Sequence, residues 1–139
     1  MIHTTMRRAA VSSALIVAVV LLSAVSAVGA NAWSRPQHRQ LAVSTLSNFK
    51  VVLTATRGAG NPPKATVTAS GFRRHAGHWD LISTQRVGKA GQWFWFSVNT
   101  CSLTTTQFRR TTRVASIKVS LLATPSIGCT RSFSLRWRP

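Results

Sequence analysis

Acidic side chains are almost absent from this chain of 139 residues, which contains a single carboxylate side chain, Asp80. Hydrolysis by paired carboxylates needs two such groups, so this class of catalysis is excluded. Eighteen Lys and Arg residues give a formal net charge of +17. Because salt-bridge partners are so few, most of these cations must be solvated, spread apart or matched by anions outside the chain.

Cysteine is also scarce, with Cys101 and Cys129 as the only two. No second cysteine or histidine lies two to four residues from either one, so the spacings typical of metal sites and redox motifs are missing. In an exported protein, two cysteines predict a disulfide between them.

Catalytic and metal-binding constellations are weak throughout the sequence. His78-Trp79-Asp80 matches the H-x-D fragment of a two-histidine, one-carboxylate iron site, but so short a match arises often by chance. No serine lies in a nucleophile-elbow context. We therefore expect no catalytic residues, no metal and no cofactor, and we do not expect an enzyme.

A long apolar run occurs only near the N-terminus. Arg7 and Arg8 precede the apolar stretch Val11–Leu22, and small residues then lead to an A-x-A cleavage pattern that ends at Ala32. This order predicts an N-terminal signal helix within a signal peptide over residues 1–32, with cleavage after Ala32.

The alternative is a retained membrane anchor, because residues 9–30 form a charge-free run long enough to span a bilayer. In that case Arg7 and Arg8 would hold the N-terminus inside. Both interpretations place the folded part outside the cytosol, either secreted or in the cell envelope.

The remaining sequence alternates between apolar and polar residues with period two, as β-strands do. We expect a linker over residues 33–45 and a β domain over residues 46–139. Alternating segments cover residues 49–57, 65–72, 79–87, 117–123 and 133–137, and a further strand is expected over residues 92–99. About six or seven short strands predict an all-β fold, a small antiparallel β-sandwich with an immunoglobulin- or fibronectin-like arrangement and one disulfide. A small closed β-barrel is the alternative.

Residues 92–99 are apolar on both faces, which predicts a central strand. Trp93 and Trp95 would then share one face and could stack sugar rings, which makes carbohydrate binding a lesser functional hypothesis. Tryptophans in a small domain more often belong to the core.

Basic residues gather in several groups along the sequence. The candidate residues for an anionic partner are Arg73, Arg74, Arg109, Arg110, Arg113, Arg131, Arg136 and Arg138. Arginine is suited to bidentate contacts with phosphate, sulfate and carboxylate. We therefore predict a non-catalytic, strongly basic domain that binds anionic cell-envelope polymers or surfaces, a membrane surface included.

Two other roles remain open at this stage. The first is a structural or protein-interaction domain, since open sheet edges can accept a strand from a protein partner. The second is that the charge serves solubility alone. Cytosolic nucleic acid is not an expected partner, because the predicted export segment removes the chain from the cytosol.

Overall fold

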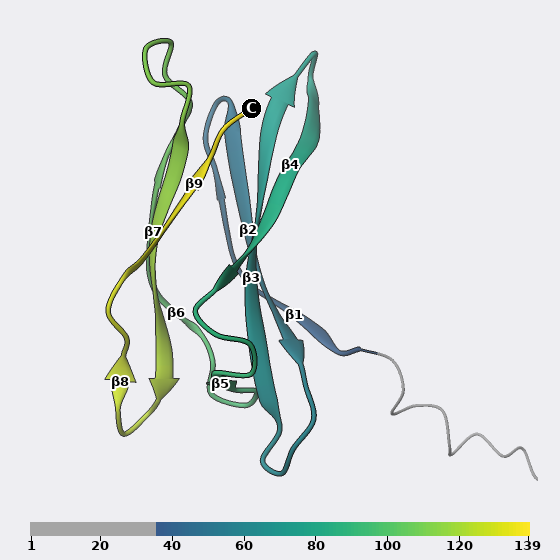
Figure 1. The fold of residues 1–139 in the computed structure, drawn as a ribbon, viewed down its shortest axis with the longest axis vertical. Helices are drawn as coiled ribbons and strands as arrows, with labels where there is room; N and C mark the ends of the chain where they lie inside the picture. Colours follow the sequence, from purple (N-terminus) through teal and green to yellow (C-terminus); the bar gives the residue numbers. More distant parts are fainter. Residues whose placement is uncertain (1–35) are drawn as a thin grey trace, which may run out of the picture.

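The computed structural model describes residues 36–139, and the predicted signal peptide, its helix and the alternative anchor over residues 9–30 lie outside them. Residues 36–139 form strands and no helix (Figure 1), so this part of the chain contains no helix capable of crossing a membrane. The bounds are β1 His38–Thr45, β2 Phe49–Arg57, β3 Lys64–His75, β4 His78–Val87, β5 Trp93–Phe94, β6 Thr100–Thr106, β7 Ala115–Thr124, β8 Gly128–Cys129 and β9 Phe133–Trp137.

The first sheet is an antiparallel meander in the order β1-β2-β3-β4, with the short strand β5 paired to the start of β3. The alternation predicted for residues 49–57 is confirmed, because β2 places every second side chain in the core. A two-residue turn joins β3 to β4, and its residues Ala76 and Gly77 both have positive φ angles, 46° and 84°. Positive φ at both central positions is the geometry of tight hairpin turns.

The second sheet is built around β7, which pairs antiparallel with β6 along one edge. Along its other edge, the first half of β7 pairs with β9 and the second half pairs with β8, both antiparallel. Figure 1 shows the two sheets as two layers. The turn between β7 and β8 follows Thr124, with Gly128 in the left-handed region at φ 80°.

One core fills the space between the sheets. Its members are Phe49, Val51, Leu53, Ala55, Ala65, Val67, Ala69, Val87, Trp93, Val98, Ala115, Ile117, Val119, Leu121 and Trp137. Rings from the two layers meet directly, since Phe49 and Trp137 lie 5.4 Å apart between centroids and Trp93 and Phe133 lie 5.9 Å apart. The prediction of an all-β fold with two packed antiparallel sheets is therefore confirmed.

The strand order differs from that of an immunoglobulin domain. Immunoglobulin sheets divide their strands as ABED and CFG, so that chain neighbours often lie in different sheets. Here four consecutive strands share the first sheet through three hairpins. Alternation within strands reports which residues are buried, but it carries no information about which strands are neighbours.

Two local predictions were wrong. The expected linker over residues 33–45 contains β1, whose polar residues pair with β2 across a bulge between Gln40 and Ala42. The expected central strand over residues 92–99 is a strand only at Trp93 and Phe94, after which the chain turns, with hydrogen bonds from the Ser97 and Val98 amides to the Phe94 carbonyl. A segment with apolar residues at successive positions is also compatible with a turn, because here Trp93 and Val98 are buried at the two ends of the turn.

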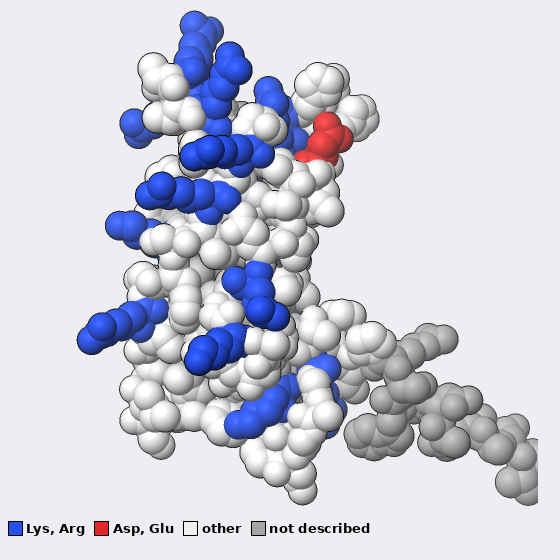
Figure 2. Space-filling model, in the orientation of Figure 1, with Lys and Arg blue, Asp and Glu red and all other residues white. Residues whose placement is uncertain are grey.

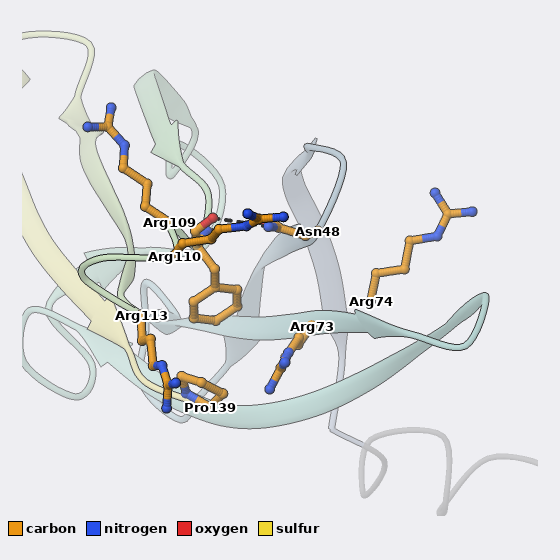
Figure 3. Close-up of a pocket in the computed structure, with 8 residues that line it drawn as sticks. Asn48, Arg73, Arg74, Arg109, Arg110, Arg113 and Pro139 are labelled. Atoms are coloured by element: carbon orange, nitrogen blue, oxygen red, sulfur yellow. Dashed lines mark hydrogen bonds between the residues drawn. The ribbon is translucent and has the colours of Figure 1, made fainter.

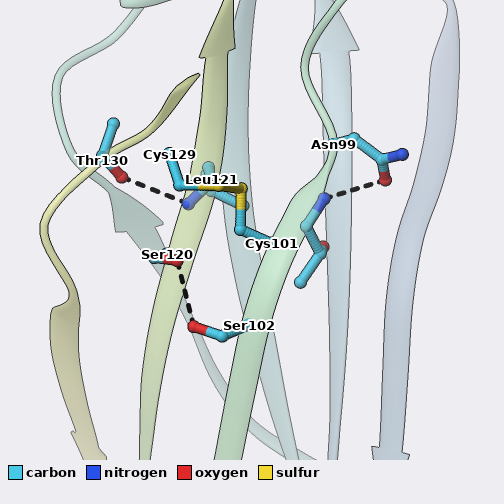
Figure 4. Close-up of a disulfide and its surroundings, with 8 residues drawn as sticks. Asn99, Cys101, Ser102, Ser120, Leu121, Cys129 and Thr130 are labelled. Carbon is cyan, nitrogen blue, oxygen red and sulfur yellow. Dashed lines mark hydrogen bonds between the residues drawn. A yellow bond between two sulfur atoms is a disulfide. The ribbon is translucent and has the colours of Figure 1, made fainter. Parts of the chain in front are cut away.

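The predicted disulfide between Cys101 and Cys129 is present, with Cα atoms 6.1 Å apart (Figure 4). Thr100 pairs with Leu121 and Cys129 pairs with Leu122, so the disulfide joins β6 to β8 beside the same stretch of β7. Both cysteines are exposed on the second sheet, and the bond does not cross the core.

Candidate anion-binding site

Five of the predicted arginines surround one open cavity at an end of the domain (Figure 3). The cavity has a volume of about 680 Å³ and is lined by Asn48, Arg73, Arg74, Phe108, Arg109, Arg110, Arg113 and Pro139. We call it the arginine cavity. None of its lining residues is acidic.

Two separate segments supply the five arginines. Arg73 and Arg74 lie in the last residues of β3, which the sequence had suggested as a connection. Arg109, Arg110 and Arg113 lie between β6 and β7. All five side chains are exposed, because β3 and the loop extend beyond the part of the sheets that covers the core.

Asn48, in the turn between β1 and β2, holds the arginine loop against the first sheet. Its side-chain amide donates to the Phe108 carbonyl at 3.0 Å, and its side-chain oxygen accepts from the Phe108 amide at 3.2 Å. The Arg74 amide also donates to the Asn48 carbonyl at 3.1 Å. One residue therefore connects the end of β3 to the loop that carries the other three arginines.

Phe108 forms the apolar part of the cavity wall. Its ring packs edge-on against the core residue Phe49 at 5.5 Å, and the Arg73 guanidinium lies over the ring at 6.0 Å. A guanidinium over an aromatic face is stabilised by the ring's quadrupole without any anion. The Phe108 ring thereby positions the Arg73 guanidinium at the cavity without a salt bridge to Asp80.

The loop backbone is shaped to present its arginines. The Arg113 amide donates to the Arg109 carbonyl at 2.9 Å, which closes one turn, and Arg113 has a φ of 46°. A bulky residue in the left-handed region is an outlier that costs free energy, and such outliers gather at functional sites. In Figure 3 the Arg113 side chain lies beside Pro139, whereas Arg109 and Arg74 extend outward.

The single carboxylate does not neutralise the cavity. Asp80 is the cross-strand neighbour of Arg73, yet its carboxylate lies 3.9 Å from the His75 ring nitrogen, a contact that is an ion pair only when the imidazole is protonated. Both partners of that pair are largely exposed. None of the side chains that line the cavity is a carboxylate that could pair with the five arginines, so an external anion would meet little competition from side chains.

The other three predicted arginines do not line the cavity. Arg131 lies between β8 and β9, and Arg136 and Arg138 are exposed on and just after β9. Arg136 pairs with Ser116 and Lys118 pairs with Ser134, so Arg136 and Lys118 are diagonal neighbours on the outer face of the second sheet. Figure 2 shows basic side chains at the cavity end and continuing down this side of the molecule.

The two tryptophans of the carbohydrate hypothesis do not form a common exposed face. Trp93 is 1% exposed, and its indole nitrogen donates to the Val87 carbonyl at 3.4 Å. Trp95 is half-buried beneath the Arg39 guanidinium. A sugar ring therefore has no access to the pair.

Sequence reasoning missed Asn48, Phe108 and Lys118. Lys118 was recognisable as the polar member of an alternating strand. Asn48 and Phe108 gave no comparable signal, because their roles depend on a contact between residues 60 positions apart.

Comparisons with known proteins return nothing: no family model, curated protein or solved structure matches the chain.

Proposed function

We propose that this protein is a non-catalytic binding domain that works outside the cytosol and holds an anionic polymer in the arginine cavity. The ligand class is a flexible chain bearing repeated phosphate, sulfate or carboxylate groups, as cell-envelope polymers do. The observation that carries the proposal is the placement of five arginines from two distant segments around one cavity with no acidic lining residue.

The energetic argument rests on charge and geometry together. Each arginine offers a planar set of donors that fits an oxyanion, and binding releases counterions from the polymer. Because the cavity is open, a polymer can pass through it and continue along the basic face formed by Lys118 and Arg136. A single small anion would use only part of this surface.

The disulfide and the sequence of residues 1–32 support an extracytoplasmic setting. A disulfide is compatible with an oxidising compartment, where such bonds form and persist. The signal peptide predicted from Arg7, Arg8 and the A-x-A pattern would deliver the chain there. In that setting the polymers of the cell envelope are candidate ligands that carry repeated anionic groups.

The test is a titration of the full chain with linear inorganic polyphosphate over a range of NaCl concentrations. The variant Arg73→Gln/Arg110→Gln/Arg113→Gln removes three cavity charges, and Arg86→Gln/Lys89→Gln/Arg131→Gln removes three charges elsewhere. We expect the cavity variant to lose about tenfold or more in affinity. The slope of log K against log salt should become shallower by about 2, because each contact contributes about 0.7 for a single strand.

The control variant should change affinity by less than about threefold, since distant charges are screened beyond about 10 Å at 0.1 M salt. Equal losses in the two variants would mean that total charge, and not the cavity, sets affinity. That result, or negligible polyphosphate binding at low salt, would reject the proposal and leave the charge as a device for solubility.

A further inference from the structure

Exposed aromatic and apolar side chains lie at the end of the domain opposite the arginine cavity. There the chain makes a turn over residues 93–98, which we call the aromatic turn, and the turn between β7 and β8 lies at the same end (Figure 1). Phe96 is 71% exposed and Ile127 is 75% exposed. These are the two most exposed large apolar side chains among the described residues.

Each of the three outer rings of the aromatic turn carries a cation on its face. Lys64 lies 3.5 Å from the centroid of Phe94, Arg39 lies 5.1 Å from Trp95, and Arg57 lies 5.9 Å from Phe96. Aromatic rings beside long basic side chains form an amphipathic surface, since the stems are apolar and the heads are charged.

The aromatic turn is fixed in place from both sides. The Arg39 guanidinium donates to the Trp95 carbonyl at 3.0 Å and to the Val98 carbonyl at 2.6 Å. The Trp95 amide donates to the Pro63 carbonyl at 3.0 Å, and Trp93 is anchored in the core. The turn therefore holds Phe96 in solvent, where the free energy of burying its ring is not gained.

The N-terminal segment enters the domain at this same end. His38, the first residue of β1, bonds to Thr56, and the Arg57 amide donates to the Gln37 carbonyl at 2.8 Å. The charge-free run over residues 9–30 is followed by residues 31–37, which can span at most about 25 Å when extended. If that run is kept as an anchor, it holds this end of the domain within that distance of a bilayer; after cleavage at Ala32, the charge and the exposed apolar side chains alone would bring it there.

We propose that the aromatic turn and the tip of the β7–β8 turn dock on an anionic phospholipid surface. Phe96 and Ile127 enter the boundary between headgroups and acyl chains, and Arg57 and Lys64 reach lipid phosphates. The chemistry is complementary, because a domain with net charge +17 is attracted to a negative surface and these apolar side chains gain burial there. This surface is separate from the arginine cavity, which it leaves facing away from the bilayer.

The experiment reconstitutes the full chain with phosphatidylcholine vesicles, with or without phosphatidylglycerol, and measures hydroxyl-radical oxidation of side chains. Leu81, which is 58% exposed on β4 at the cavity end, is the internal reference. With phosphatidylglycerol present, oxidation of Phe96 and Ile127 should slow by about threefold or more, because docking covers most of the exposed surface of these two side chains. Oxidation of Leu81 should not change.

Two charge variants complete the test. Arg57→Gln/Lys64→Gln should abolish the protection of Phe96, whereas Lys118→Gln/Arg136→Gln, which removes the same charge from the second sheet, should keep it. Unchanged oxidation of Phe96, equal protection with and without phosphatidylglycerol, or protection of Leu81 in its place would each overturn the docking proposal. The cavity variant Arg73→Gln/Arg110→Gln/Arg113→Gln should retain the protection of Phe96. Loss of polymer binding and loss of membrane docking can therefore be distinguished.

Discussion

At Gly71 the backbone of the first sheet lies directly against a side chain of the second. A Cβ atom built on Gly71 would lie 2.4 Å from the indole nitrogen of Trp137, which itself donates to the Ser83 carbonyl at 3.1 Å. The Trp137 ring comes from the second sheet and covers the bend where β3 shifts register against β4, between Gly71 and Phe72. Glycine is required here by close approach, because the Gly71 backbone itself is not in the left-handed region.

Gly71→Ala should therefore destabilise the fold by about 1 to 3 kcal/mol, the usual cost of overpacking a core. The measurement is urea unfolding, with Trp137 contributing to the fluorescence signal. Gly58→Ala is the matched control, since its Cβ would meet only the Lys64 carbonyl at 3.6 Å. A Gly71→Ala protein as stable as the control would show that Trp137 can move without cost.

The disulfide secures an element that has little else to hold it. β8 is two residues long and pairs with β7 only at Leu122 and Thr124. Further support comes from Thr130, whose amide bonds to the Leu121 carbonyl at 2.9 Å and whose hydroxyl accepts from the Leu121 amide (Figure 4). Because the cysteines are 28 residues apart, the bond also closes a sizeable loop in the unfolded chain.

Cys101→Ser/Cys129→Ser should lower the free energy of unfolding by about 3 to 4 kcal/mol, as the chain-entropy model gives for a loop of this length. Thermal and urea unfolding measure the change. Ser102→Ala serves as a control at the neighbouring residue, and it should lose only about 1 kcal/mol with its hydroxyl contact to Ser120. Equal stability of the double variant and the parent protein would contradict this account.

At the level of elements, sequence patterns succeeded wherever one strand face is buried. Phe49–Arg57 and Phe133–Trp137 were predicted with their final bounds because burial alternates along them. β1 was missed because its side chains are only half-buried or exposed, so no strict alternation is imposed on them. The aromatic turn was misread because its stability comes from Arg39, which is 56 residues away from Trp95 in the sequence.

The candidate site could be predicted only in part for the same physical reason. Arginine-rich segments identified Arg73, Arg74 and the loop residues, since charge is visible in composition. That these segments meet around one cavity depends on the β1–β2 turn and on the side chain of Asn48, which bonds across 60 residues. Arg131 was included in the prediction although it lies outside the cavity, because charge alone carries no position.

The charge of the whole molecule sets how its stability responds to salt. With 18 basic residues and one acidic residue, repulsion among the cations opposes the compact state. The contact between Asp80 and His75 joins two exposed groups, so it offsets little of this repulsion. Aromatic rings stabilise some of these cations in place of carboxylates. The Lys50 ammonium, for example, lies 4.7 Å from the ring centroid of Phe72 and 5.0 Å from that of Trp79.

Added NaCl should therefore raise Tm, since the Debye length falls from about 30 Å at 0.01 M to about 10 Å at 0.1 M. A gain of about 1 kcal/mol corresponds to about 4 to 8 °C for a domain of this size. Differential scanning calorimetry measures it, with sucrose as a control for preferential exclusion at matched osmolality. A Tm that falls as NaCl is added would mean that attractive pairs, and not repulsion, dominate.

The position of Trp137 has a consequence for the order of assembly. A chain that is exported behind its signal peptide, as the proposed function requires, delivers the four hairpin-connected strands β1 to β4 before the second sheet, and these can pair locally. Trp137, whose ring covers Gly71 and whose indole nitrogen donates to the Ser83 carbonyl, lies 54 residues after Ser83 in the sequence. Until β7 and Trp137 follow, the apolar side of the first sheet is uncovered and is accessible to proteases and to other chains.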